Sequence, residues 1–230
     1  MNVAVVIPAL NEAGCIESLV HEAHQQPVQR VIVVDNGSTD DTGRLACQAG
    51  ATVVREPRRG YGYACAAGIA AAGEADVVVF MDGDYSMLPG EMPVVLRPIL
   101  AGEADLALGS RVLGHIAPGA MPAQQRFGNG LAAGLMRLLY GLRVTDPSPY
   151  RAVRRDLLLR LGMREMTFGW PTEMTVKAAR CRARIVEVPV SFHPRLAGQS
   201  KVSGTLRGTL QAGYNIVGVT VRYVGWRPAT

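Results

Sequence analysis

The sequence predicts an α/β fold in which a mostly parallel sheet carries helices on both of its faces. Over the first hundred residues, short apolar runs rich in β-branched residues alternate with runs of small residues that suit helices. The apolar runs are continuous rather than interrupted by polar residues, as expected of strands buried on both faces. Right-handed crossovers between such strands place the intervening helices on both sides of the sheet.

The first half of the chain is predicted to alternate regularly between strands and helices. The strands are expected at residues 3–7, 31–34, 52–55, 77–81 and 106–109. The helices are expected at residues 12–24, 40–49, 60–72 and 91–101. The second of these helices begins with acidic residues, which are favourable at the positive end of a helix dipole.

The second half is less regular. Helices are expected at residues 124–140, 155–162, 172–181 and 204–224, and short strands at 151–153 and 184–190. Pro189 indicates that the last strand lies at a sheet edge, because proline cannot donate a ladder hydrogen bond. A Pro-rich turn is expected at 146–150, and a loop rich in glycine, serine and basic residues at 193–203. Because no linker, repeat or low-complexity segment interrupts the chain, we expect a single domain over residues 1–230.

Charge and cysteine usage narrow the functional classes. The formal net charge is +5, and from Arg195 onwards the chain has five basic residues and no acidic one. This balance favours nucleotide phosphates or anionic lipid as partners, and we expect no nucleic-acid partner. The four cysteines form no CxxC pair, which argues against a zinc site or disulfide framework and favours the cytoplasm. We also expect no secretory leader and no run of roughly 20 apolar residues that could span a bilayer.

Polar motifs follow three of the predicted strands, at residues 8–12, 35–41 and 82–86. Ligands of parallel sheets bind beyond the carboxyl ends of the strands. We therefore expect the three motifs to converge on one site.

The motif DGDYS places Asp82 and Asp84 on either side of Gly83, directly after a buried strand. Carboxylate oxygens are hard ligands for Mg²⁺ or Mn²⁺, which commonly bridge a protein to phosphates. Gly83 permits a close approach of the backbone. The alternative is a solvated turn, since Asp-Gly is a common turn dipeptide. The position beside two other polar motifs favours the metal site.

The other two motifs combine candidate ligands with helix caps. Asp35 ends a strand and can accept a hydrogen bond from a ribose hydroxyl or a base edge, whereas residues 38–41 suit the capping of the next helix. Pro8 stops the first strand, and Asn11 and Glu12 begin the next predicted helix, a pattern that is also typical of a capped helix start.

These motifs resemble, in order and spacing, those of the family 2 inverting glycosyltransferases: PALNE, VDNGSTDDT, RRGYGYACAAGIA and DGDYS. The resemblance continues through GSR, DPSPYR, GWPTEMTVKA and PRLAGQSKVSG, so it covers nearly the whole chain. The sequence looks most like the dolichyl- or polyprenyl-phosphate sugar synthases.

The resemblance implies a GT-A fold with a Rossmann-like sheet, a nucleotide-sugar-binding half (1–111), an acceptor-binding half (112–203), and a C-terminal amphipathic helix and tail (204–230). It implies nucleotide binding by Pro8, Ala9, Asn11, Glu12, Asp35, Asn36, Gly60, Asp82 and Gly83. It implies binding of Mg²⁺ or Mn²⁺ by Asp82, Asp84 and Ser86, and phosphate binding by Arg195, Ser200 and Lys201. It implies catalytic roles for Asp84, Arg111, Asp146 and Glu173.

Two residues depart from the family pattern. Asn36 stands where the VDDGS motif has its second aspartate, which puts base recognition in question. Ser86 stands where many polyprenyl-phosphate enzymes have a metal-binding glutamine.

The acceptor is indicated by an absence in the second half. A hydroxyl acceptor needs a general base, and family members that act on hydroxyls commonly carry a Glu-Asp pair at the start of a helix. The aligned residues 169–173 lack that pair, and a phosphate acceptor needs no base. We therefore expect transfer of a hexose from GDP-mannose or a UDP-hexose to polyprenyl phosphate. The alternative is a soluble or polysaccharide hydroxyl acceptor, with Glu173 or Asp146 as the base.

The last predicted helix favours a peripheral location at the inner face of the membrane. An apolar stripe with basic residues on other faces is typical of helices that lie in the headgroup region, although packed surface helices and homo-oligomer contacts show the same period. The stripe comprises Leu206, Leu210, Tyr214, Val217, Val221 and Val224.

Two further functions are less favoured. One is a sugar-phosphate nucleotidylyltransferase, which would carry a Gly-rich basic loop after its first strand. The other is a non-catalytic nucleotide-binding module.

Overall fold

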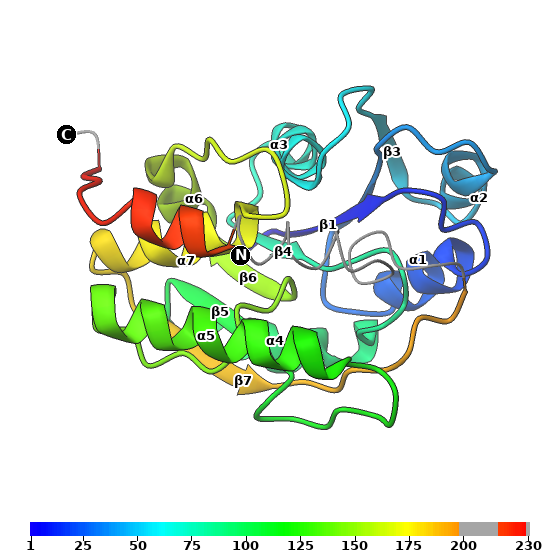
Figure 1. Cartoon of the computed structure of the whole chain (residues 1–230). Coiled ribbons are helices and arrows are strands. Elements are labelled where there is room, and N and C mark those ends of the chain that lie inside the picture. Colours follow the sequence, from blue (N-terminus) through cyan, green and yellow to red (C-terminus); the bar gives the residue numbers. More distant parts are fainter. Residues whose placement is uncertain (198–215, 229–230) are drawn as a thin grey trace.

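In a computed structural model, which describes residues 1–197 and 216–228, one seven-stranded sheet runs through the molecule (Figure 1). The strand order is β3-β2-β1-β4-β6-β5-β7, and every strand is parallel to its neighbours except β6, which is antiparallel to both of its own. The strands are β1 (Val3–Ala9), β2 (Arg30–Asp35), β3 (Thr52–Arg55), β4 (Val77–Phe80), β5 (Leu106–Ser110), β6 (Arg151–Arg154) and β7 (Ile185–Pro189).

Helices cover both faces of the sheet, as the sequence predicted. They are α1 (Ile16–His24), α2 (Thr42–Gln48), α3 (Tyr61–Ala72), α4 (Met92–Leu100), α5 (Ala123–Tyr140), α6 (Arg155–Leu161) and α7 (Trp170–Arg180), with a short 3₁₀ helix at Pro89–Glu91. Apolar residues of α1, α2 and α4 form one core with one face of the strands, and those of α3, α5, α6 and α7 form a second core with the other face. Successive strand residues point to opposite faces, so Val5 belongs to the first core and Val6 to the second.

The predicted α/β class with a mostly parallel sheet is confirmed, and β7 lies at a sheet edge as Pro189 indicated. The first helix begins at Ile16 rather than at residue 12. The reason is local, since Asn11 adopts a left-handed backbone conformation (φ 54°) and the chain turns before the helix starts. Helical hydrogen bonding then begins where the amides of Cys15 and Ile16 donate to the Glu12 carbonyl.

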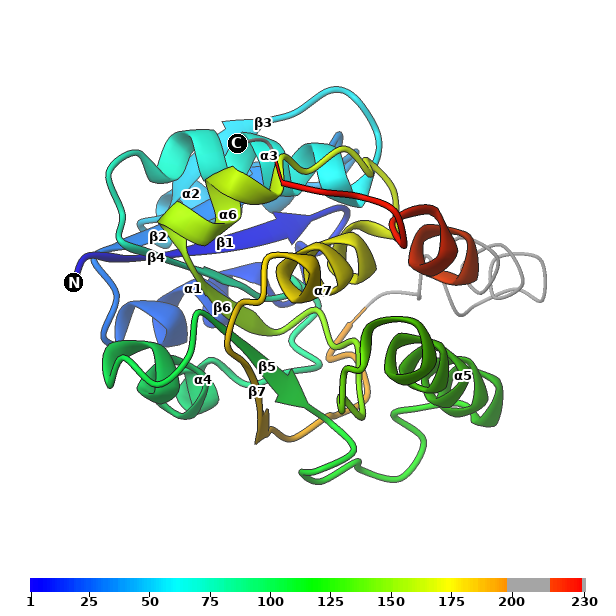
Figure 2. The ribbon, with the colours of Figure 1, turned by 90° about the vertical axis from the view of Figure 1, so that its left-hand side faces the viewer.

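The final helix is described over residues 216–222, and the predicted residues 204–215 lie outside the described part of the chain. Val219 and Tyr223 pack into the second core, while Val221 and Val224 of the predicted stripe are exposed. The Tyr140 hydroxyl at the end of α5 donates to the Thr220 carbonyl at 2.5 Å, so α5 and this helix lie side by side (Figure 2). Across the described ranges, no helix combines the length and apolarity needed to cross a bilayer.

Candidate active site

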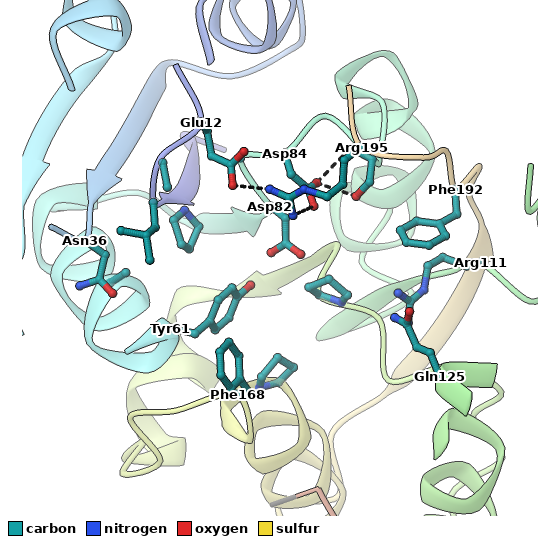
Figure 3. A pocket seen from close by; sticks show the side chains of 18 of the residues that line it. Glu12, Asn36, Tyr61, Asp82, Asp84, Arg111, Gln125, Phe168, Phe192 and Arg195 are labelled. Atoms are coloured by element: carbon teal, nitrogen blue, oxygen red, sulfur yellow. Dashed lines mark hydrogen bonds and ion pairs between the residues drawn. The ribbon is translucent and has the colours of Figure 1, made fainter. Parts of the chain in front are cut away.

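A pocket of about 800 Å³ lies beyond the carboxyl ends of β1, β2 and β4, where the three polar motifs were expected to converge (Figure 3). Its wall combines residues from both halves of the chain. Those that the sequence had indicated are Pro8, Ala9, Glu12, Asn36, Gly60, Asp82, Gly83, Asp84, Ser86, Arg111 and Arg195.

Asp82 projects into this pocket just after β4. Its Oδ1 is buried and has no hydrogen-bond partner among the described residues. Burial, followed by the charge of the neighbouring Asp84, raises the pKa of Asp82 to about 7. A Cβ atom at Gly83 would lie 3.1 Å from the Pro8 carbonyl oxygen, so a larger residue would crowd the first motif. The charges of Arg111 and Arg195 act on Asp82 in the opposite direction but do not offset this rise of its pKa.

The Asp84 carboxylate accepts hydrogen bonds from Ser86 and Arg195. The Ser86 backbone amide and hydroxyl donate to Asp84 Oδ1 at 3.0 and 2.6 Å, while the Arg195 guanidinium donates to Oδ2 at 2.7 Å. The same guanidinium donates to Glu12 at 2.6 Å and so bridges the first and third motifs (Figure 3). The serine hydroxyl, predicted as a metal ligand, is here engaged with the aspartate.

The segment that carries Arg195 is fastened over the DGDYS turn. The His193 amide donates to the Ser86 carbonyl at 2.8 Å, and the Leu196 amide to the Asp84 carbonyl at 3.4 Å. The guanidinium therefore reaches the carboxylates from a backbone that is hydrogen-bonded to the main chain of the DGDYS turn. Ser200 and Lys201, the other predicted phosphate-binding residues, lie outside the described residues.

Asn36 holds the loop between β3 and α3. Its Nδ2 donates to the carbonyls of Glu56 and Arg58 at 3.0 and 2.7 Å, and its Oδ1 accepts from the Gly60 amide at 2.8 Å. An aspartate could accept the last bond but could not donate the other two. The departure from the VDDGS pattern therefore has a structural role at the pocket wall.

Two predicted nucleotide-binding residues do not line the pocket. Asp35 Oδ1 accepts from the Ser38 amide at 2.8 Å, and Asn11 Oδ1 accepts from the Thr39 amide at 2.8 Å. Both side chains therefore order the turn behind the pocket wall, and their predicted role in nucleotide binding stays a prediction.

Arg111 and Asp146 form a buried, bidentate ion pair with both N–O distances at 2.7 Å. The Arg111 backbone amide also donates to this carboxylate at 2.9 Å, and the guanidinium stacks 4.9 Å from the Phe192 ring centre. Arg111 reaches the pocket wall, whereas Asp146 is fully buried behind it. Asp146 is therefore suited to orient Arg111 rather than to accept a proton.

Glu173 does not reach the pocket, so its proposed role as a base is not supported by its position. It is fully buried, accepts from the amides of Arg164 and Glu165, and pairs with Lys177 at 2.6 Å. Its hydrogen bonds hold the loop before α7 in place, which is a structural role.

Several residues of the pocket were missed by the sequence interpretation. The Tyr61 hydroxyl points towards Asp82, Phe168 lies beside Tyr61, and Phe192 and Gln125 lie on the other side of the pocket with Arg111 (Figure 3). His193 also lines the pocket, and its Nε2 is buried with no hydrogen-bond partner in the described structure. Tyr61 lies inside the RRGYGYACAAGIA segment, which was used only for the resemblance, and Phe168 directly precedes GWPTE. No feature of the sequence alone marked Gln125.

The sequence is similar to those of known glycosyltransferases. Residues 4–162 match the model of glycosyl transferase family 2. An uncharacterised glycosyltransferase of Mycobacterium tuberculosis is 41% identical over 91% of this chain and 94% of its own length. The undecaprenyl-phosphate mannosyltransferase of Micrococcus luteus is 32% identical over 99% of this chain and 98% of its own.

A solved structure extends the likeness to the fold. Glucosyl-3-phosphoglycerate synthase from Mycobacterium tuberculosis, in complex with Mn²⁺, UDP and glucosyl-3-phosphoglycerate, matches with a TM-score of 0.78 and 27% identity. The match covers 100% of this chain and 81% of the other. With its GT-A architecture and a family match over most of its length, the chain belongs to glycosyl transferase family 2.

Proposed function

We propose that this enzyme transfers a hexose from a nucleotide diphosphate-sugar, GDP-mannose or a UDP-hexose, to polyprenyl phosphate at the cytoplasmic face of the membrane. The observation that carries the proposal is that neither candidate base, Asp146 or Glu173, is available to accept a proton from an acceptor in the pocket. Asp146 is held by Arg111, and Glu173 lies outside the pocket. A phosphate acceptor is already ionised near neutral pH and needs no base. The named reaction of the Micrococcus luteus relative supports the same acceptor.

A divalent cation, Mg²⁺ or Mn²⁺, fits the residues after β4. Asp82 and Asp84 would hold it, since their charges repel each other and Asp82 Oδ1 has no partner in the described structure. No cluster of three or more His, Cys, Asp or Glu side chains that could hold a metal occurs in the described ranges, so water and the diphosphate would supply the other ligands. Such an ion neutralises charge on a leaving diphosphate. The Mn²⁺ of the glucosyl-3-phosphoglycerate synthase complex supports this assignment.

Arg195 is the described side chain best suited to the leaving group. In the inverting reaction an acceptor oxygen attacks the anomeric carbon, the bond to the diphosphate oxygen breaks, and the nucleoside diphosphate leaves with the electron pair. Arg195 already lies between Asp84 and Glu12, and its guanidinium can pair with the departing phosphate by charge-assisted hydrogen bonds. Arg111 is suited to the sugar or the acceptor phosphate, and Ser200 and Lys201 remain part of the proposed phosphate site.

A soluble phosphorylated acceptor with a reacting hydroxyl is the second candidate. It is favoured by the likeness to glucosyl-3-phosphoglycerate synthase, whose structure contains a glucosylated phosphoglycerate. Such a reaction needs a base in the pocket, and His193, with its unpartnered Nε2, is the described residue suited to that role.

The test is transfer of radiolabelled sugar from GDP-mannose, UDP-glucose and UDP-GlcNAc to undecaprenyl phosphate or to 3-phosphoglycerate. Each reaction is run with Mn²⁺ or with EDTA, for the wild type and for Asp84→Ala. A metal-dependent, lipid-linked product that the variant does not make is the expected result. Product on phosphoglycerate alone, lost in His193→Ala, would replace the lipid acceptor with the soluble one.

A further inference from the structure

Helix α5 presents apolar side chains on two opposite faces. Ala132 and Met136 are buried, with Met136 packed in the second core. On the other side, Phe127, Leu131 and Leu138 are 75%, 48% and 78% exposed, and we call these three residues the outer stripe. At 3.6 residues per turn they lie within about 40° of one another around the helix axis. A soluble surface helix needs only one apolar face, so the outer stripe indicates a contact outside the described protein.

The surroundings of the outer stripe are basic. Residues 123–145 contain three arginines and neither aspartate nor glutamate. Arg126 and Arg137 are exposed on α5, both on one flank of the stripe at roughly 80–100° from Phe127, and Arg143 is exposed just beyond the helix end. An apolar stripe flanked by arginines has the chemistry of a helix that lies in the headgroup region of an anionic bilayer.

Helix α5 itself borders the active-site pocket, through the face opposite the outer stripe. Gln125, in the first turn of α5, lines the pocket, and Tyr140 at the other end bonds to the helix of residues 216–222. That helix contributes Ile216 to the pocket wall and exposes Val221. Each of the two helices therefore contributes a residue to the pocket wall, and both lie on one side of the molecule (Figure 2).

We propose that the outer stripe docks the enzyme on an anionic lipid bilayer. The inference rests on the proposed function, because a polyprenyl phosphate presents its phosphate at that surface. A second copy of the chain is a poorer occupant. A two-fold interface brings the same patch of both subunits together, and the arginines of the two patches would then repel each other with no acidic residue of α5 to offset them.

Co-sedimentation of the full chain with phosphatidylcholine vesicles, with and without phosphatidylglycerol, tests the proposal. Phe127→Ser/Leu138→Ser should weaken binding to both vesicle types by about tenfold, because two apolar side chains no longer enter the bilayer. Arg126→Gln/Arg137→Gln should weaken binding only to the anionic vesicles, by about fivefold per arginine. Matched controls are Leu100→Ser/Leu159→Ser and Arg97→Gln/Arg160→Gln, which change exposed residues of α4 and α6 and should bind like the wild type.

Wild-type binding by the stripe variant would overturn the docking surface. So would a concentration-dependent dimer, seen by analytical ultracentrifugation, that only this variant loses while its vesicle binding is unchanged. Thermal melts check that each variant folds. Transfer to polyprenyl phosphate in detergent micelles separates this proposal from the proposed function. A wild type that binds vesicles through the stripe but makes no lipid-linked product refutes only the acceptor, whereas product in micelles without vesicle binding refutes only the docking surface.

Discussion

At the scale of single residues, the raised pKa of Asp82 has a consequence for stability. The folded-state pKa of about 7 exceeds the ordinary 3.8, so between these values the folded protein binds a proton that the unfolded chain has lost. The free energy of unfolding therefore falls as pH rises through this window. We expect Asp82→Asn, in metal-free buffer, to raise the thermal midpoint at pH 8 and to raise it less at pH 5, where only part of this loss has occurred.

Thermal melts with EDTA at the two pH values measure this effect, and Asp156→Asn is the control. The pKa of Asp156 is lowered by hydrogen bonding to Arg154, so its variant should lose stability at pH 8 instead. An equal midpoint shift for Asp82→Asn at both pH values would contradict the raised pKa of Asp82 in the folded protein.

The pairing of Arg111 with Asp146 makes a second prediction. Arg111→Met should destabilise the protein by about 3–5 kcal/mol, because it leaves the Asp146 charge buried and uncompensated. Arg111→Met/Asp146→Leu should recover most of that stability while transfer activity stays lost. Urea denaturation of the two variants and of Asp146→Leu completes the double-mutant cycle. A double variant no more stable than Arg111→Met would show that the buried charge is not the cause.

At the scale of elements, the pocket wall depends on how closely a loop crosses α3. A Cβ atom at Gly62 would lie 2.3 Å from the Glu165 carbonyl oxygen, and the same loop continues to Phe168 at the pocket. Gly62→Ala should displace this loop, lower the thermal midpoint and raise the donor or acceptor KM. Gly130→Ala on α5, where no atom lies within 4 Å, should be neutral or stabilising by up to about 1 kcal/mol. If both variants behave alike, the loop is not held by its contact with α3.

The strands and helices were predictable because their signals are local. Continuous runs such as Val77–Phe80 and the Ala-rich α3 indicate their own conformation. The late start of α1 was not predictable, since it depends on Asn11, whose backbone amide and side chain both bond to the loop after β2. The antiparallel direction of β6 between β4 and β5 was also not predictable, because a four-residue strand sequence does not indicate which strands it pairs with or in which direction.

The candidate site divides in the same way. The positions of Asp82, Asp84 and Asn36 at the pocket were predictable, because these residues closely follow strands and the end of a parallel strand fixes where such residues lie. The sequence did not indicate that Asp146 and Glu173 are both buried in ion pairs, because each is simply a carboxylate near a predicted turn or helix start. Only tertiary contacts with Arg111 and Lys177 distinguish a buried partner from an available base.

At the scale of the whole molecule, ligand binding should report the donor. A nucleoside diphosphate that binds the folded state at a hundred times its Kd adds about 2.7 kcal/mol to the free energy of unfolding. We expect GDP or UDP to raise the thermal midpoint of the wild type only when Mn²⁺ or Mg²⁺ is present, and Asp84→Ala to show no such rise. A nucleotide shift that EDTA leaves unchanged would argue against a metal held by Asp82 and Asp84.

The place of β6 also sets the order in which the chain can fold during synthesis. When the ribosome has released residues 1–111, the apolar strand β4 lacks its β6 neighbour and β5 has no partner strand at all. An exposed apolar edge of this kind invites pairing with other chains. Only after residues 151–154 emerge can β4 and β5 join one sheet, and only then can β7 add to its end. Residues 1–111 therefore do not complete a sheet by themselves, and we expect a fragment that ends there to aggregate rather than to act as a smaller enzyme.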